Sequence, residues 1–255
     1  MKVIFYCLIL ILERLFPTRD IAVILYHRID DDGNYSVKPE LFEKQLKHLK
    51  KLDYVSISPE DLKGFLDGKI NLSRRSILIT FDDGFKDNYS IAYPLLKKYN
   101  FTATFFISAR HIGKLSDYSE KIKNKEMMSF AELSELIENG FTVANHFYSH
   151  RNLTEISDQE IESEFNHACE ILSNIVNSEN DLKYVAYPRN RTTSNVFATL
   201  KKVGVKLGFG GNPALVSGIV DYLNIPRIEI FGNNSVLKFR VKISGHYYRL
   251  INLFR

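Results

Sequence analysis

The protein has 255 residues, of which 45% are hydrophobic and 25% are charged, a balance that is typical of globular chains and excludes a disordered one. Its formal net charge of +4 is too small to indicate nucleic-acid binding, and we expect no nucleic-acid partner. The chain has two cysteines, Cys7 and Cys169, and their positions indicate neither a disulfide framework nor a cysteine-based zinc site.

The first segment in chain order is apolar from Val3 to Leu12 and is closed by Glu13 and Arg14. It is too short to span a bilayer as a helix, and no small-residue cleavage site follows it, although its length suits a signal-peptide core. An uncleaved signal, a monotopic anchor and a helix packed on the domain all fit this pattern. We favour contact with a membrane surface, hence a membrane-associated or exported protein, with a cytoplasmic one as the alternative. We therefore separate residues 1–19 from a single domain of residues 20–255.

After this segment, predicted strands and helices alternate. Short runs rich in β-branched and aromatic residues predict strands at residues 21–27, 54–57, 76–81, 103–108, 141–144, 184–187, 205–209 and 224–230. Between them apolar residues recur at helical spacing, with capping signals at Ser58, Ser129 and Ser157, and one last helix is expected from Ser235. This alternation predicts parallel β-α units, which form either an open sheet or a barrel; we assign an α/β fold, an irregular (β/α) barrel.

Groups that can ionise or bind a metal follow four of the predicted strands. In a (β/α) barrel, functional residues collect at the carboxyl ends of the strands, so we expect these groups to share one mouth. They are His27, the pair Asp82 and Asp83, the pair His146 and His150, and the run Tyr187, Pro188 and Arg189.

The two histidines at the fourth-residue spacing are the strongest indication of a metal. On a helical turn, His146 and His150 would lie on one face and could share an ion. Alone, they would be unrelated surface histidines, and Asp82-Asp83-Gly84 would be a plain turn. Together, two imidazoles and one carboxylate are typical of an open, catalytic centre with one divalent ion, zinc by preference, although nickel or cobalt also fits. We expect one aspartate to bind the ion and the other to act as a base toward water.

Several stretches resemble motifs of the polysaccharide deacetylases with a NodB homology domain, carbohydrate esterase family 4. "TFDDG" (Thr80–Gly84) resembles the first motif, "NHFYSH" (Asn145–His150) resembles the second, and "YPRN" (Tyr187–Asn190) lies where the third is expected. "LYHRI" (Leu25–Ile29) and "IPRIEI" (Ile225–Ile230) further resemble the subgroup that acts on poly-N-acetylglucosamine. The resemblance covers most of the chain and implies the distorted (β/α) barrel of this family.

The resemblance also implies an activity and a role for each matching residue. The family removes acetyl groups from N-acetylated sugars, in polymers or on lipids, with the help of a divalent metal ion. Asp82 matches the catalytic base, and Asp83 matches the metal ligand, together with His146 and His150. His27 matches the general acid that protonates the departing amine. The expected function is therefore a metal-dependent carbohydrate N-deacetylase in cell-surface polysaccharide or glycolipid metabolism.

The third motif and the loop between the histidines depart from the family pattern. The resemblance places substrate and oxyanion contacts at Tyr187, Pro188 and Arg189, with the backbone amide of Arg189 as an oxyanion donor. Arg189 and Asn190 replace an aromatic residue and a glycine; Arg189 would contact an anionic group of the substrate, pair with the catalytic base or lie at the surface. Phe147 replaces a hydroxyl residue that supports the loop.

Two alternative functions follow from these departures and from the chemistry. One is a degenerate, non-catalytic carbohydrate-binding homologue, and the other is a metal-dependent hydrolase of another amide or ester. The remaining histidines are expected away from the chemistry: His111 in a loop, His48 and His167 facing solvent on helices, and His246 at the surface.

Overall fold

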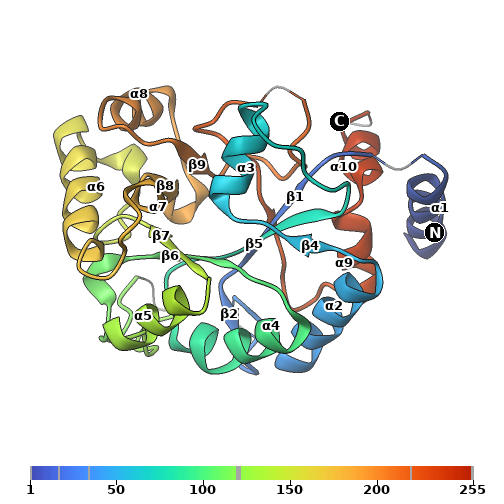
Figure 1. Ribbon diagram of the computed structural model, residues 1–255, viewed down its shortest axis with the longest axis horizontal. Helices are drawn as coiled ribbons and strands as arrows, with labels where there is room; N and C mark the ends of the chain where they lie inside the picture. Colours follow the sequence, from blue (N-terminus) through green and yellow to red (C-terminus); the bar gives the residue numbers. More distant parts are fainter. Residues whose placement is uncertain (1, 17, 34, 119–121, 219, 254–255) are drawn as a thin grey trace.

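A curled parallel sheet forms the centre of the molecule. The computed structural model of the protein describes residues 2–16, 18–33, 35–118, 122–218 and 220–253 (Figure 1). In this part of the chain, helices surround the sheet, whose strands run in the order β10, β1, β5, β6, β7, β8 and β9, with β4 beside β5. The bounds are β1 Ala22–Tyr26, β4 Val55–Ser56, β5 Ser76–Phe81, β6 Thr104–Ile107, β7 Thr142–Asn145, β8 Tyr184–Ala186, β9 Leu207–Phe209 and β10 Ile228–Glu229. A separate small sheet pairs β2 (Arg28–Ile29) with β3 (Ser36–Val37).

The strands are rich in apolar residues because both faces of the sheet are covered. Every residue of β1 and β5 is buried. Ile24 belongs to a core cluster that includes residues of the outer helices, whereas its neighbour Val23 packs with Phe209 and Ile225 inside the curl. With burial of this kind, the charged side chains of the site lie beyond the strand ends, as Asp82 and Asp83 do after β5.

One segment joins the two edges of the sheet. The Ile225 N–H donates to the Gly208 carbonyl of β9 (2.8 Å), and the Gly210 N–H donates to the Ile225 carbonyl (2.9 Å). Three residues later, Ile228 of β10 pairs with Ile24 of β1. The first and last strands are thereby connected, which confirms the predicted irregular (β/α) barrel.

The outer helices begin where the sequence predicts. Reciprocal capping boxes at Ser58, Ser129 and Ser157 satisfy first-turn amides of α3, α5 and α6. The helices are α2 Pro39–Lys51, α3 Pro59–Leu66, α4 Tyr93–Tyr99, α5 Phe130–Glu138, α6 Asp158–Leu172, α7 Glu179–Leu182 and α8 Ser194–Lys202. Short π- or 3-10-helical turns cover Asn88–Ala92, Ala109–His111, Leu153–Glu155 and Pro188–Asn190.

The single last helix predicted from Ser235 is wrong. The chain forms α9 (Val236–Lys242) and α10 (Gly245–Leu253), with a break before Gly245. A Cβ at Gly245 would overlap Oγ1 of Thr18, and the Gly245 N–H donates to Oε2 of Glu13 (3.0 Å). The break therefore lets the N-terminal segment approach the start of α10.

The N-terminal segment is a helix, α1 (Lys2–Leu15), at one end of the molecule beside α9 and α10 (Figure 1). Ile9 is fully buried, whereas Leu8 and Ile11 are each 53% exposed. None of the helices in the described part of the chain is long and apolar enough to cross a membrane. The division into residues 1–19 and 20–255 stays a prediction, and its end residues 1 and 255 lie outside the described part.

Candidate active site

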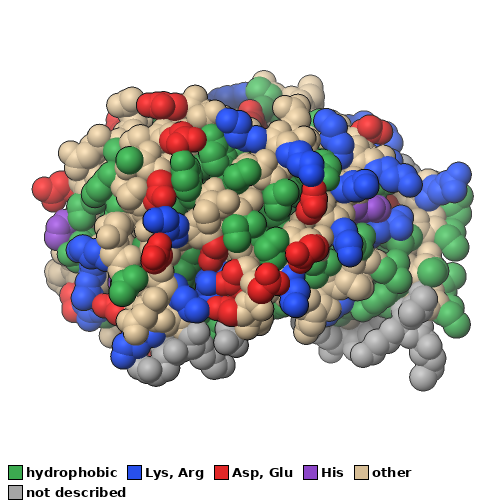
Figure 2. Space-filling view, turned by 90° about the horizontal axis from the view of Figure 1, so that it is seen from below, with side chains coloured by type: hydrophobic (Ala, Val, Ile, Leu, Met, Phe, Trp, Pro, Cys, Tyr) green, Lys and Arg blue, Asp and Glu red, His purple; other side chains and the backbone are tan. Residues whose placement is uncertain are grey.

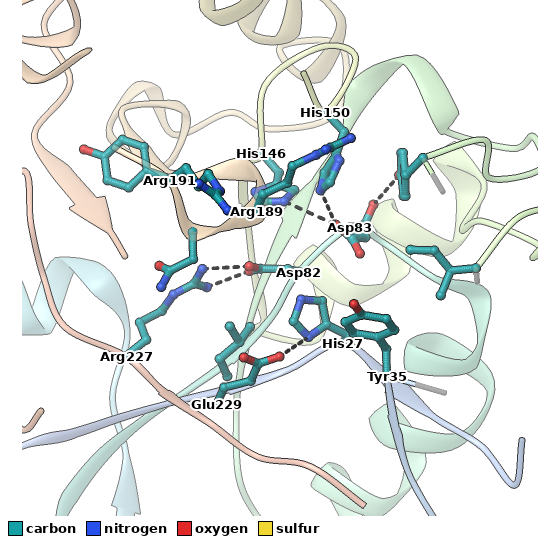
Figure 3. Close-up of a pocket in the computed structure, with 15 residues that line it drawn as sticks. His27, Tyr35, Asp82, Asp83, His146, His150, Arg189, Arg191, Arg227 and Glu229 are labelled. Carbon is teal, nitrogen blue, oxygen red and sulfur yellow. Dashed lines mark hydrogen bonds and ion pairs between the residues drawn. The ribbon is translucent and has the colours of Figure 1, made fainter. Parts of the chain in front are cut away.

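Strand β5 ends in Asp82 and Asp83, and the backbone turns between them. Side chains alternate along a strand, so successive carboxylates cannot face one site while the strand continues. Asp83 (φ +74°) and Gly84 (φ +92°) both adopt the left-handed conformation. A Cβ at Gly84 would lie 3.0 Å from Cδ1 of Ile107, so only glycine fits here without strain. The turn lets both buried carboxylates face one cavity (Figure 3).

Asp83 lies between the two histidines that follow β7. Its Oδ1 is 3.2 Å from Nε2 of His146 and 3.2 Å from Nε2 of His150. One potential ligand atom from each of the three residues lies within 4.8 Å of the other two. Burial alone would raise the pKa of Asp83, but the adjacent imidazoles outweigh burial and hold this pKa well below its usual value. The carboxylate is therefore ionised.

Further contacts of this cluster fit a divalent cation. Nδ1 of His146 is 2.8 Å from the Ala186 carbonyl, so this nitrogen donates to the backbone and Nε2 is the nitrogen that faces the cluster. Oδ1 of Asp83 is buried and has no hydrogen-bond partner within the described residues. Two imidazole nitrogens and a carboxylate oxygen leave further coordination positions open, as in catalytic centres. These donors suit zinc, nickel and cobalt alike.

The two histidines do not lie on the helical turn that their spacing predicts. Phe147 and His150 have φ values of +62° and +60°, which a right-handed helix does not contain, so this prediction is wrong. The rings of His146 and His150 nevertheless lie 5.1 Å apart between centroids. A loop with two residues of positive φ, and not a helix, brings the two candidate ligands together.

Other contacts replace the missing hydroxyl group at Phe147. Its ring is fully buried, and its N–H donates to Oδ1 of Asn145 (2.7 Å). The Ser149 N–H donates to Oε2 of Glu164 (2.8 Å), which projects from α6. The ring of Tyr118 packs over His150 at 4.4 Å between centroids. The loop is thus ordered by a buried aromatic anchor and a buried glutamate.

Asp82 is paired with Arg227, which is distant in sequence and lies next to β10. The guanidinium donates from both terminal nitrogens to the two carboxylate oxygens, each at 2.7 Å, and both residues are buried (Figure 3). Burial by itself raises the pKa of Asp82, but Arg227, His146 and His27 together outweigh it and lower this pKa below its usual value. Arg189 does not form this pair, so that alternative is wrong.

His27 lies beyond the end of β1 and is partly open to the cavity. Its Nδ1 is 3.4 Å from Oε1 of Glu229, the last residue of β10. Figure 3 shows the other ring nitrogen turned away from Glu229. A second residue of the closing segment thereby orients the predicted general acid.

The third predicted motif lies at the rim of the cavity. Tyr187 is buried and lines the cavity, and its hydroxyl group donates to the Leu223 carbonyl (2.6 Å). Pro188 is buried and is not among the described lining residues, whereas Arg189 is exposed and lines the cavity. In all, His27, Asp82, Asp83, His146 and His150 share one cavity of about 410 Å³ with Tyr187 and Arg189.

The remaining histidines lie away from the cluster, but not all at the surface. His111 is buried, 2.6 Å from Oδ1 of Asp117, and its ring packs edge-on against Tyr118. His48 is half-buried, so its predicted solvent-facing position is wrong. Nε2 of His246 lies 2.7 Å from the Phe16 carbonyl, in the contact between α10 and the N-terminal segment.

Comparison with known proteins decides the family. Residues 69–208 match the family model described as polysaccharide deacetylase. The poly-β-1,6-N-acetyl-D-glucosamine N-deacetylase of Staphylococcus aureus is 33% identical over 208 residues, which cover 77% of this chain and 68% of that protein. The chain belongs to the polysaccharide deacetylase family.

Further relatives agree with this assignment. The Bacillus subtilis protein YxkH is 26% identical over 197 residues, and the match covers 77% of this chain and 66% of that protein. The matched regions thus span about two thirds of either relative. These findings confirm the family expected from the sequence and favour a deacetylase over a non-catalytic binding protein.

Solved structures support the fold of this polysaccharide deacetylase. A polysaccharide deacetylase from Bacillus cereus has a TM-score of 0.74 at 26% identity, covering 88% of this chain and 69% of that one. The deacetylase PplD of Streptococcus pyogenes has a TM-score of 0.77 at 24% identity, covering 88% and 98%, and it supports the fold alone.

Sequence reasoning gave no role to Arg227, Glu229, Tyr118 or Glu164. Arg227 and Glu229 occupy alternate positions in an apolar segment, a spacing that places both on one face of a strand. This alternation could have indicated that both side chains face the site. Tyr118 and Glu164 carry no local signal, because only the tertiary fold brings them to the loop of His146 and His150.

Proposed function

We propose that this polysaccharide deacetylase hydrolyses the acetamide bond of an N-acetylated amino sugar. Asp83, His146 and His150 would hold one divalent metal ion, preferably zinc. The observation that carries the proposal is the position of Asp82, bound by Arg227 and beside this cluster, in the cavity that His27 also lines. A base, an acid and an electrophilic centre are the groups that amide hydrolysis needs.

When bound, the cation supplies Lewis-acid activation of water and of the acetyl carbonyl. Asp82 accepts the proton that the attacking water loses. Because Arg227 engages both carboxylate oxygens at 2.7 Å, Asp82 stays anionic and fixed in orientation. The base therefore needs no reorganisation before it acts.

His27 donates a proton to the nitrogen as the carbon–nitrogen bond breaks, giving acetate and a free amine. Glu229, 3.4 Å from Nδ1, orients the ring so that the other nitrogen carries the proton to be transferred. The backbone N–H of Arg189 would donate to the developing oxyanion. The hydroxyl group of Tyr187 is not this donor, because it is engaged by Leu223.

We infer the class of substrate from the name of one relative. The Staphylococcus aureus protein is named for poly-β-1,6-N-acetyl-D-glucosamine. A cavity of about 410 Å³ suits one sugar ring with its acetamido group. We therefore infer an N-acetylated sugar within a polymer or on a lipid, in cell-surface polysaccharide or glycolipid metabolism.

Acetate release and metal content, measured together, test this function. The purified full chain is loaded with zinc, nickel or cobalt and incubated with chitin oligomers, poly-N-acetylglucosamine and lipid-linked N-acetyl amino sugars. We expect one equivalent of metal and acetate release from at least one sugar. Metal binding without release from any sugar would favour another amide or ester as substrate, and failure to bind metal would overturn the proposed centre.

We also propose that α1 contacts an anionic membrane surface. Its exposed apolar residues recur at helical spacing on the face turned away from α9 and α10: Ile4, Leu8, Ile11 and Leu15. Figure 2 shows hydrophobic side chains at the end of the molecule where Figure 1 places α1, with lysine or arginine side chains nearby. Arg14 and Arg19 are exposed in or just after this helix. An apolar stripe with adjacent cations is typical of interfacial helices.

Vesicle sedimentation tests this contact. The full chain is expected to sediment with phosphatidylglycerol vesicles, and less with phosphatidylcholine vesicles. The double variant Leu8→Ser and Ile11→Ser should lose most of this binding. A double variant at exposed apolar positions elsewhere, Val55→Ser and Ile70→Ser, is the control and should keep it. Equal sedimentation of both variants would contradict the proposal.

A further inference from the structure

The side chains of two arginines at the rim of the cavity have no role in the chemistry described above. Arg189 and Arg191 are exposed and line the same cavity as Asp82 and Asp83. Within the described residues, neither guanidinium group has a hydrogen-bond or ion-pair partner. Figure 3 shows both near His146, on the opposite side of Asp82 from His27 and Glu229. One wall of the mouth therefore carries free positive charge.

The acidic groups of the cavity cannot neutralise this wall, because each already has a partner. Asp82 is bound by Arg227, Asp83 contacts His146 and His150, and Glu229 contacts His27. The three carboxylates that line the cavity are thus committed within the described structure. Arg189 and Arg191 remain available to a ligand.

The loop that carries the arginines has an energetically unfavourable backbone conformation. Arg189 (φ +59°) and Asn190 (φ +54°) are consecutive non-glycine residues in the left-handed region. Such residues are energetically unfavourable and persist where the surroundings fix them. Here Nδ2 of Asn190 donates to the Gly211 carbonyl (2.9 Å), and the Asn190 N–H donates to the Tyr187 carbonyl (2.9 Å). The arginines are therefore presented from a fixed loop.

A polar depression of about 670 Å³ continues from the cavity past these arginines. No carboxylate lines it among the described residues; apart from Arg189 and Arg191, its wall offers mainly amide and hydroxyl groups, from Thr154, Asn190, Thr192, Thr193, Asn212 and Asn224. Guanidinium groups with surrounding amides and hydroxyls recognise carboxylate and phosphate oxygens. A saccharide unit next to the one in the cavity would occupy this depression.

We propose that Arg189 and Arg191 bind an anionic group, carboxylate or phosphate, on the unit next to the N-acetylated sugar. The inference rests on the proposed function in that it takes the cavity as the acetamido-sugar site. It makes the preferred substrate an acidic glycan, in which every acetamido sugar to be hydrolysed has a charged neighbour. A neutral poly-N-acetylglucosamine would lack this contact.

Binding is measured apart from turnover, so that the two proposals can fail separately. Three short oligosaccharides share an N-acetylglucosamine unit and differ in its neighbour: a neutral hexose, a uronic acid or a phosphorylated hexose. Calorimetric titration into the zinc-loaded full chain is expected to give at least about tenfold tighter binding of one or both acidic forms, weakening as salt rises. Tighter binding of one acidic form alone identifies its group as the ligand.

The variants identify the residues responsible. The double variant Arg189→Gln and Arg191→Gln should reduce the ratio of acidic to neutral affinity about tenfold. Arg74→Gln removes an exposed arginine that precedes β5, at the opposite end of the barrel, and should leave that ratio unchanged. Equal binding of all three oligosaccharides by the unaltered protein, or a preference that survives in the double variant, would overturn the proposal. Preferential binding without acetate release would uphold it while rejecting the proposed function.

Discussion

The loops on the two sides of the mouth are built in opposite ways. After β5 and β7, Asp82, Asp83 and His146 are buried, and their charged or polar groups meet other side chains or the backbone. After β8, Arg189 and Arg191 are exposed and without partners within the described residues. Both sides use left-handed backbone, at Asp83 on one and at Arg189 on the other.

On the roles proposed above, this difference separates the residues of the chemistry from those that recognise the substrate. Reacting groups must be held in one geometry before the substrate arrives, so their partners lie within the protein. A recognition group gains binding energy only if its partner arrives with the substrate, because a satisfied guanidinium would have to give up an existing contact. The comparison predicts that substitutions on the paired side reduce turnover, whereas those on the unpaired side change substrate preference.

The largest effect is expected at the metal cluster. His146→Ala removes one of three candidate ligands and should lower both metal content and acetate release to background. Metal analysis of the purified variant and an acetate assay measure the two quantities. His246→Ala is the matched control and should retain both, because His246 lies at the contact of α10 with the N-terminal segment. Full activity of His146→Ala would contradict the cluster.

Asp82→Asn tests the base on the same side. The amide preserves the shape of the side chain but cannot accept the proton, so kcat should fall roughly 10²- to 10⁴-fold. Metal content should stay at the level of the unaltered protein, since Asp83 is the proposed ligand. Thermal unfolding monitors the buried Arg227, which loses its charged partner in this variant. Loss of metal in a folded Asp82→Asn protein would reverse the assignments of the two aspartates.

A smaller effect is expected when the contact between Arg227 and Asp82 is weakened and the positive charge is kept. Arg227→Lys keeps a cation beside Asp82 but cannot hold both oxygens, so kcat should fall about tenfold with little change in KM. The control is Arg151→Lys, which alters an ion pair with Glu160 (2.9 Å) in which both side chains are about half exposed. Unchanged kcat in Arg227→Lys would mean that fixing the orientation of Asp82 contributes little.

The smallest effect lies outside the mouth and concerns His48, which is half-buried on α2. Burial and the nearby Arg240 and Lys51 lower the pKa of His48 from 6.5 to about 4, and its Nε2 is buried and unpaired within the described residues. The unfolded chain therefore binds more protons between these values, so stability falls as the pH drops from 6.5 toward 4. His48→Gln should remove roughly 1–2 kcal/mol of this acid-dependent loss.

Urea unfolding at pH 7 and pH 5 measures this change. His167→Gln, at an exposed position on α6, is the control and should leave the pH dependence as it is. The same loss of stability in His48→Gln as in the unaltered protein would show that other groups cause it.

Sequence patterns predicted the features of this molecule that depend on local order. Capping boxes such as Ser157-x-x-Glu160 and apolar runs such as β5 could be recognised because the residues that form them are close together in the sequence. The pairing of Asp82 with Arg227 could not be read in this way, because it joins residues 145 positions apart. The helical turn assumed for His146 and His150 failed because spacing alone does not reveal positive φ values.

The segment that closes the barrel has a consequence for how the protein matures. Arg227 and Glu229 lie beyond residue 208, where the family match ends, and they reach Asp82 and His27 only when the last strand docks beside the first. Contacts between such distant parts of a chain form slowly. A growing chain that has emerged as far as residue 208 already carries every candidate metal ligand, yet lacks Arg227 and Glu229, the partners of Asp82 and His27. On the proposed assignment, the candidate metal ligands are therefore synthesised before the residues that orient the proposed base and acid.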